Sequence, residues 1–108
     1  MSEMSRYLRY LINGDKEAIV TPFEVTDTPT EFTSQLSEGY SRKMLAFYNN
    51  SHADSGEVYY GYSATLATTN GHPIPLGARV SVPVSTDISV YLVSASGEKG
   101  DIRAEEVS

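Results

Sequence analysis

The sequence predicts an all-β fold, a small antiparallel β-sandwich or jelly-roll-like domain of seven or eight short strands with little helix. Short runs of β-branched and aromatic residues are separated by turn signals at a spacing of about 8–12 residues. Several runs alternate apolar with polar residues, as half-buried strands do. The chain has 108 residues and no cysteine, so we expect a flexible N-terminal arm at residues 1–5 and a single disulfide-free domain at residues 6–108.

The first predicted strands form a hairpin. Residues 7–12 fit a helical stripe or a strand, and the following Asn13-Gly14 pair, a hairpin turn signal, favours a strand. Its expected partner covers residues 17–23. Pro22 lies within that partner and has no N–H to donate, which restricts the strand to a sheet edge or a bend.

Residues 26–40 are mostly polar. Phe32 and Leu36 are four residues apart, which fits a single helical turn that begins at Pro29, with Thr28 as its N-cap, and ends at Leu36. A loop laid over the neighbouring part of the domain fits equally well.

The remaining two-thirds of the chain reads as strands separated by turns. Gly61 indicates a bulge or a close backbone approach. Alternation places Val82 and Leu92 on core-facing sides, and the last strand is expected to pair with the strand at residues 88–95. The expected strands cover residues 42–49, 57–62, 66–68, 78–84, 88–95 and 101–107.

Charge and hydropathy argue against two classes of partner. Lys and Arg number 8 against 14 Asp and Glu, a net charge of −6, whereas nucleic-acid binding needs a clustered basic surface. No apolar run is long enough for a membrane-spanning helix, and the first residues lack the pattern of a signal peptide. We therefore expect neither nucleic acid nor membrane as a partner.

No residue grouping indicates catalysis, a cofactor or a metal. Glu105 and Glu106 are adjacent in a predicted strand and point to opposite faces, so they cannot act together on one bond. His52 and His72 lie in predicted turns, where a histidine is most often simply solvated. The oxygen-rich stretch at residues 49–57 lacks the ligand spacing of a calcium-binding loop and fits an Asx-rich turn.

Four segments carry a resemblance to a known group of proteins. They are the turn before Gly56-Glu57-Val58-Tyr59, the corner Asn70-Gly71-x-Pro73-x-Pro75-x-Gly77, the strand Ile88-x-Val90-Tyr91-Leu92-Val93 and the closing Ile102-Arg103-Ala104-Glu105-Glu106. This order resembles small β-domain virion proteins of tailed bacteriophages, of the capsid decoration, cement or head-accessory type. It covers about the last two-thirds of the chain and includes no catalytic motif.

The resemblance implies a non-enzymatic structural protein of the virion. Such a protein is made in the host bacterial cytoplasm and binds the capsid exterior, with the major capsid protein or another virion protein as its partner and a dimer or trimer as its own state. A tail, neck or fibre-base component is an alternative within the same class. A carbohydrate- or receptor-binding β-module that uses Tyr59, Tyr60, Tyr62 and the two histidines is an alternative from another class.

Residues 1–12 and 26–40 are the candidate contact segments, because arms and tyrosine-rich faces are suited to docking. A disordered tail and an ordinary surface loop fit the two segments equally well. The expected interface residues are Arg6, Tyr7, Tyr10, Phe32, Leu36, Tyr40, Tyr60 and Tyr62.

Overall fold

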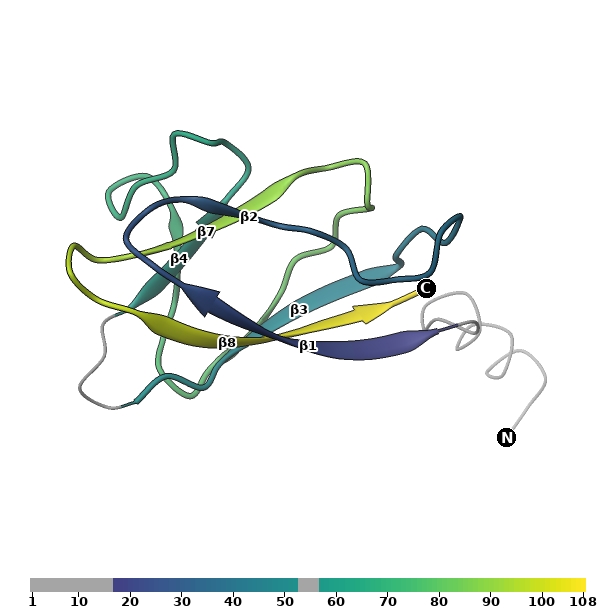
Figure 1. The fold of residues 1–108 in the computed structure, drawn as a ribbon, viewed down its shortest axis with the longest axis horizontal. Coiled ribbons are helices and arrows are strands. Elements are labelled where there is room, and N and C mark those ends of the chain that lie inside the picture. The colour runs from purple at the N-terminus through teal and green to yellow at the C-terminus, as the bar shows by residue number, and fades with distance from the viewer. Residues whose placement is uncertain (1–16, 53–56) are drawn as a thin grey trace.

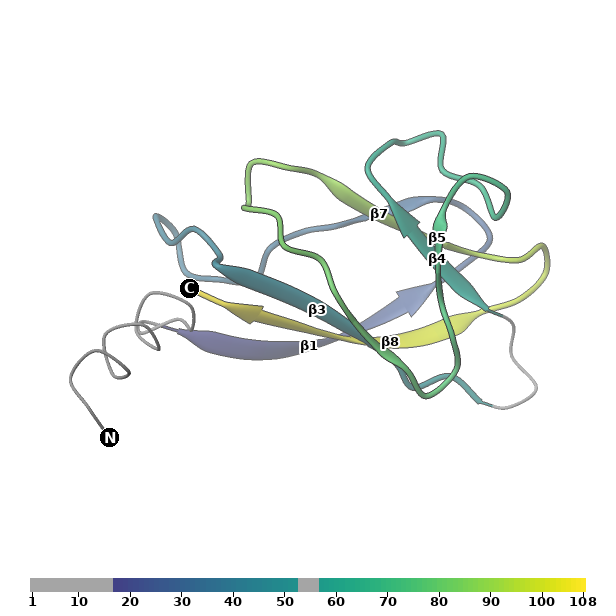
Figure 2. The same cartoon turned by 180° about the vertical axis from the view of Figure 1, so that it is seen from behind.

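A computed structural model describes residues 17–52 and 57–108, which form eight strands and no helix. Two four-stranded antiparallel sheets pack face to face, in the orders β1-β8-β3-β6 and β2-β7-β4-β5 (Figures 1 and 2). The predicted all-β sandwich is thus confirmed. The strands are β1 (Ala18–Val25), β2 (Thr30–Phe32), β3 (Met44–Asn49), β4 (Val58–Gly61), β5 (His72–Ile74), β6 (Arg79–Ser81), β7 (Val90–Ser94) and β8 (Gly100–Val107).

The strand pairing is that of a jelly roll. β1 pairs with β8, β2 with β7, β3 with β6 and β4 with β5, all antiparallel. This nested pattern arises when one long antiparallel hairpin is rolled up into two sheets. The pairing of β3 with β8 completes the first sheet, and the pairing of β4 with β7 completes the second.

The core lies between the two sheets and follows the alternation of the strands. β8 shows it most clearly, because every second residue from Gly100 to Ser108 is buried. Val82 and Leu92 are fully buried, as predicted. The core cluster consists of Val25, Phe32, Leu45, Phe47, Val58, Ile74, Val82, Val90, Leu92, Ile102 and Ala104.

A row of aromatic rings crosses this core from one sheet to the other. The ring centroids of Phe23 and Phe32 lie 5.7 Å apart, those of Phe32 and Phe47 5.8 Å, and those of Phe47 and Tyr60 6.2 Å. The first two pairs are edge-to-face, an arrangement that aromatic quadrupoles favour. The rings come from strands β1, β2, β3 and β4, which alternate between the two sheets. Their contacts therefore fix how one sheet is positioned over the other.

Pro22 faces the edge of β1 that pairs with no other described strand. Ser108 N donates to Glu17 O (2.9 Å), so Glu17 and every second residue after it direct their backbone groups toward β8. The residues between them, including Pro22, direct theirs away from β8. β1 is the outer strand of its sheet, as Pro22 predicted, whereas the predicted partner at residues 7–12 lies outside the described residues.

The prediction that the last strand pairs with residues 88–95 is wrong. β8 pairs with β1 and β3, whereas β7 pairs with β2 and β4. The connection at residues 95–99 carries the chain from one sheet to the other. β7 and β8 therefore belong to different layers, and their adjacency in sequence does not make them hydrogen-bonded neighbours.

Two other local predictions also fail. The proposed helical turn is replaced by β2, because Phe32 pairs with Val90 and enters the core as a strand residue. Ile88, which begins the strand predicted at residues 88–95, is instead 46% exposed in the turn before β7.

Residues 66–68 lie in the loop between β4 and β5, where a strand was predicted. Leu66 is buried there, and a Cβ at Gly61 would lie 2.7 Å from Leu66 Cδ1. The atoms that approach Gly61 thus belong to the Leu66 side chain and not to a backbone segment, as the prediction of a bulge or a close backbone approach had it.

Replacing Leu92 with alanine should reduce the free energy of unfolding by about 2–5 kcal/mol, because it opens a cavity in a closely packed core. Ile88→Ala is the matched control and should cost less than about 0.5 kcal/mol, since the Ile88 side chain is exposed. Urea unfolding of both variants measures the difference. Equal losses for the two variants would contradict these burial assignments.

Candidate functional site

The loop at residues 33–43, between β2 and β3, carries two of the predicted interface residues. Leu36 is half-buried, whereas Tyr40 is 40% exposed. Tyr40 N donates to Ser37 O (3.0 Å), which closes a turn just before the tyrosine ring. The loop therefore presents an aromatic side chain on a hydrogen-bonded backbone.

Two carboxylates hold this loop against the sandwich. Glu106 Oε1 accepts from Gln35 N (2.7 Å), and Glu17 Oε1 accepts from Ser37 N (2.7 Å). Glu17 Oε2 also accepts from Ser37 Oγ (2.7 Å). These hydrogen bonds favour the charged carboxylate, so they lower the pKa of Glu17 below its ordinary value.

Glu106 is itself held by a buried arginine. The Glu106 side chain is fully buried on the inner face of β8, and Arg42 Nη1 lies 3.2 Å from its Oε2. The same guanidinium donates from Nε to Val84 O (3.0 Å) and from Nη2 to Ile88 O (3.2 Å). One ion pair thus connects β8, the loop before β3 and the connection between β6 and β7.

Both chain-terminal regions of the described structure lie beside this loop. Glu17, which precedes β1, bonds Ser37, and Ser108 N bonds Glu17 O. Figure 1 shows the start of β1, the C-terminus and the β2–β3 connection at the same end of the molecule. We call Glu17, residues 33–43 and Ser108 the docking end. It contains most of the predicted contact segment at residues 26–40.

The other predicted interface residues are divided between the surface and the core. Tyr60 and Tyr62 lie together, with ring centroids 6.3 Å apart, and Tyr60 also stacks on its cross-strand partner His72 at 5.2 Å. Tyr62 is 49% exposed, whereas burial raises the pKa of Tyr60 with a smaller contribution from Tyr62.

Phe32 cannot serve as an interface residue of the folded chain, because it is 3% exposed inside the core. Its spacing from Leu36 suggested a single helical turn, whereas in β2 the alternation directs the Phe32 side chain inward. Arg6, Tyr7 and Tyr10 lie outside the described residues.

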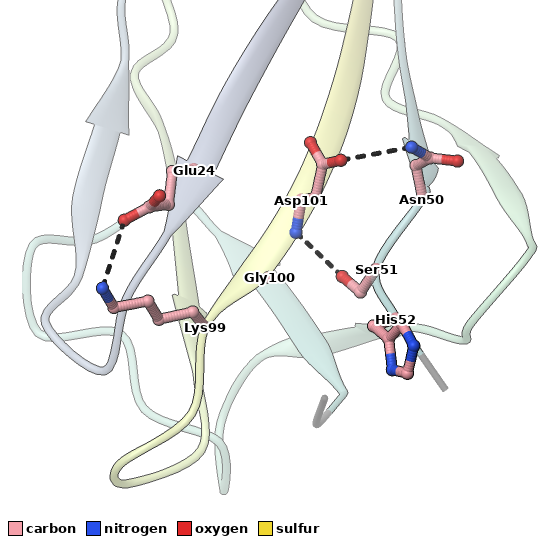
Figure 3. A pocket seen from close by; sticks show the side chains of 7 residues that line it. All are labelled: Glu24, Asn50, Ser51, His52, Lys99, Gly100 and Asp101. Carbon is pink, nitrogen blue, oxygen red and sulfur yellow. Dashed lines mark hydrogen bonds and ion pairs between the residues drawn. The ribbon is translucent and has the colours of Figure 1, made fainter. Parts of the chain in front are cut away.

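A shallow polar hollow of about 410 Å³ lies at the ends of β1 and β3 and the start of β8 (Figure 3). Lys99 Nζ is 3.8 Å from Glu24 Oε1 on one side. On the other side Asn50 Nδ2 donates to Asp101 Oδ2 (3.1 Å), and Asp101 N donates to Ser51 Oγ (2.8 Å). The lining residues are Glu24, Asn50, Ser51, His52, Lys99, Gly100 and Asp101.

Sequence reasoning missed the hollow and the buried ion pair for different reasons. The hollow combines residues from three segments that no short motif connects. The ion pair left a signal, since Glu106 shares the inward alternation of Ile102 and Ala104. A glutamate at such a position needs a buried partner, and Arg42 supplies it.

The residues that the structure describes contain no cluster of three or more side chains suited to bind a metal ion. No helix in the same residues has the length and hydropathy to span a membrane. Among the residues of the oxygen-rich stretch, Asn49 is buried and accepts from Ser51 N (3.0 Å) through Oδ1. Its amide therefore forms the Asx turn expected there.

Comparison with protein-family models gives no match for this chain, and comparison with curated proteins gives none either.

Removing one partner of the Arg42–Glu106 pair should be strongly destabilising. Arg42→Met or Glu106→Leu alone should cost about 3–5 kcal/mol, because each leaves an uncompensated buried charge. The double variant should be more stable than either single variant. Denaturant unfolding of all four proteins measures the coupling, and additive losses would contradict a direct interaction.

Acidification should weaken the anchoring of the loop through Glu17. Its folded-state pKa is lowered, so its contribution is complete above the unfolded pKa of about 4.3 and is lost as pH falls through the folded value. Glu17→Gln should therefore be less stable than wild type at pH 7, with the difference shrinking below about pH 4. Thermal unfolding at several pH values tests this, and a constant difference would exclude it.

Proposed function

We propose that this chain is a non-enzymatic structural protein of a tailed-bacteriophage virion that binds and stabilises the capsid exterior. The observation that carries the proposal is the strand order β1-β8-β3-β6 and β2-β7-β4-β5. This jelly-roll order recurs in viral capsid domains and in lectins. The turn and strand segments from Glu57 to Glu106 that resemble decoration proteins lie within this roll.

The docking end is the surface that we assign to capsid binding. It presents Tyr40 on a loop that hydrogen bonds to Glu17 and Glu106 hold in place. A tyrosine contributes a large contact area, and a preorganised loop loses little conformational entropy on binding. Both properties favour attachment to a preformed protein surface.

In this proposal the partner is the major capsid protein, and the chain is synthesised in the host bacterial cytoplasm. Many copies on one shell add many modest interfaces, so weak binding by each copy becomes strong cohesion of the particle. A dimer or trimer of the chain would bridge adjacent capsid subunits. Attachment to the tail, neck or fibre base is the alternative. There too, several copies would add their weak contacts at another part of the virion.

Tyr40→Ala should lower the occupancy of the protein on purified virions by about tenfold, the effect of losing an aromatic contact of roughly 1.4 kcal/mol. Tyr48→Ala is the matched control, since Tyr48 is 39% exposed on the outer face of β3. Virions of the phage that encodes the chain are purified on a density gradient, and occupancy is measured by quantitative mass spectrometry.

Particle imaging then locates the wild-type protein. Density on the shell supports the decoration assignment, whereas density only at the tail, neck or fibre base replaces it with the alternative. Absence of the protein from purified virions would refute the virion assignment. An equal loss of occupancy in the Tyr40 and Tyr48 variants would refute the assignment of capsid binding to the docking end.

A further inference from the structure

The polar hollow in Figure 3 is separate from the docking end. It is formed at the end of β1, just after β3 and at the start of β8, whereas the docking end adjoins the start of β1 and the end of β8. Its volume is about 410 Å³, and it is open to solvent. Proposals for the two surfaces can therefore be tested independently.

Asp101 fixes two neighbouring polar side chains at the hollow. Asn50 donates one amide hydrogen to Asp101 Oδ2, which sets the plane of the amide and leaves Oδ1 as an acceptor. Ser51 Oγ accepts a hydrogen bond from Asp101 N, so the Ser51 hydroxyl can donate its proton to a different group. Asp101 is in turn held by an ion pair with Arg103. An amide acceptor whose plane is set by Asp101 and a hydroxyl donor whose oxygen is held by Asp101 N thus stand side by side.

The opposite side of the hollow supplies a second donor and acceptor. Lys99 and Glu24 form a long ion pair of 3.8 Å, with side chains 74% and 68% exposed. An exposed pair of this kind is weak, so both groups can exchange their mutual contact for hydrogen bonds to a ligand. Gly100 forms the floor between the two sides, and a Cβ there would clash with Val58.

The charges of the lining select among ligand classes. Glu24, Asp101 and Lys99 give formal charges of −2 and +1, which disfavours phosphate and other anions. The ammonium group of Lys99 disfavours a cation at the same place. A neutral hydroxyl group both donates and accepts hydrogen bonds, so it matches a lining that mixes the two.

From this lining we propose that the hollow is a binding site for a neutral saccharide, with one sugar ring lying over Gly100. Two adjacent hydroxyl groups of the sugar bond Asn50 Oδ1 and the Ser51 hydroxyl. Further hydroxyl groups reach Glu24 and Lys99. On a virion surface such a site would give each copy a weak contact with bacterial glycans, which many copies would strengthen.

The test uses the full-length chain on an array of neutral oligosaccharides, followed by titration calorimetry with the free form of each bound glycan. Asn50→Ala and Lys99→Met should each weaken binding about tenfold, the effect of losing a hydrogen bond of roughly 1.4 kcal/mol. Both side chains are exposed, so neither change should affect folding. Ser51→Ala adds a third variant, with its folding checked by thermal unfolding.

Two controls separate this site from other surfaces. Asn70→Ala changes an exposed asparagine elsewhere, and Tyr62→Ala changes the aromatic cluster; neither should affect the titration. No binding on the array would overturn the proposal. Binding that Tyr62→Ala abolishes and Asn50→Ala leaves unchanged would also overturn it, because the sugar would then occupy the aromatic cluster. Neither result bears on virion occupancy, which tests the docking end separately.

Discussion

The buried contact between Arg42 and Glu106 is the constraint on which the rest of the structure depends. Two charges removed from water need close partners for every polar atom, and here those partners come from two separate connections, β2–β3 and β6–β7. Gln35, Val84 and Ile88 each contribute a backbone group to the same cluster. Because the cluster is satisfied only when these segments converge, it specifies how this end of the roll closes, beyond what apolar packing alone specifies.

The all-β fold was predictable because strand alternation is a local property. The burial of Val82 and Leu92 and the edge position indicated by Pro22 follow from alternation and from proline chemistry, and the structure agrees with each. Pairing is not local. A hairpin between β7 and β8 looked natural from their closeness in sequence, but β8 pairs with β1, about eighty residues earlier in the chain. Rolling the chain into two layers depends on the core as a whole, which no short window of sequence contains.

In the candidate sites, too, local features were predictable from the sequence and contacts between distant segments were not. The predicted contact segment at residues 26–40 does contain an exposed, supported loop, because polar composition and turn residues are visible locally. Sequence reasoning misplaced Phe32, since a spacing of four fits both a helical face and a strand followed by a loop. The hollow was not foreseen, because Glu24, Asn50 and Lys99 become neighbours only when the ends of β1, β3 and β8 meet.

The position of Pro22 has a consequence for behaviour in crowded solution. An uncovered outer strand can recruit the strand of another molecule and start an ordered polymer. On β1 the backbone N–H groups of Ala18 and Val20 face outward, and Pro22 then interrupts the row before Glu24. At this edge of the described sheet an incoming strand would meet only a short row of N–H groups before Pro22. At this edge of the described sheets, Pro22 therefore limits the addition of a strand from another molecule, whereas β6, β2 and β5 are the other outer strands.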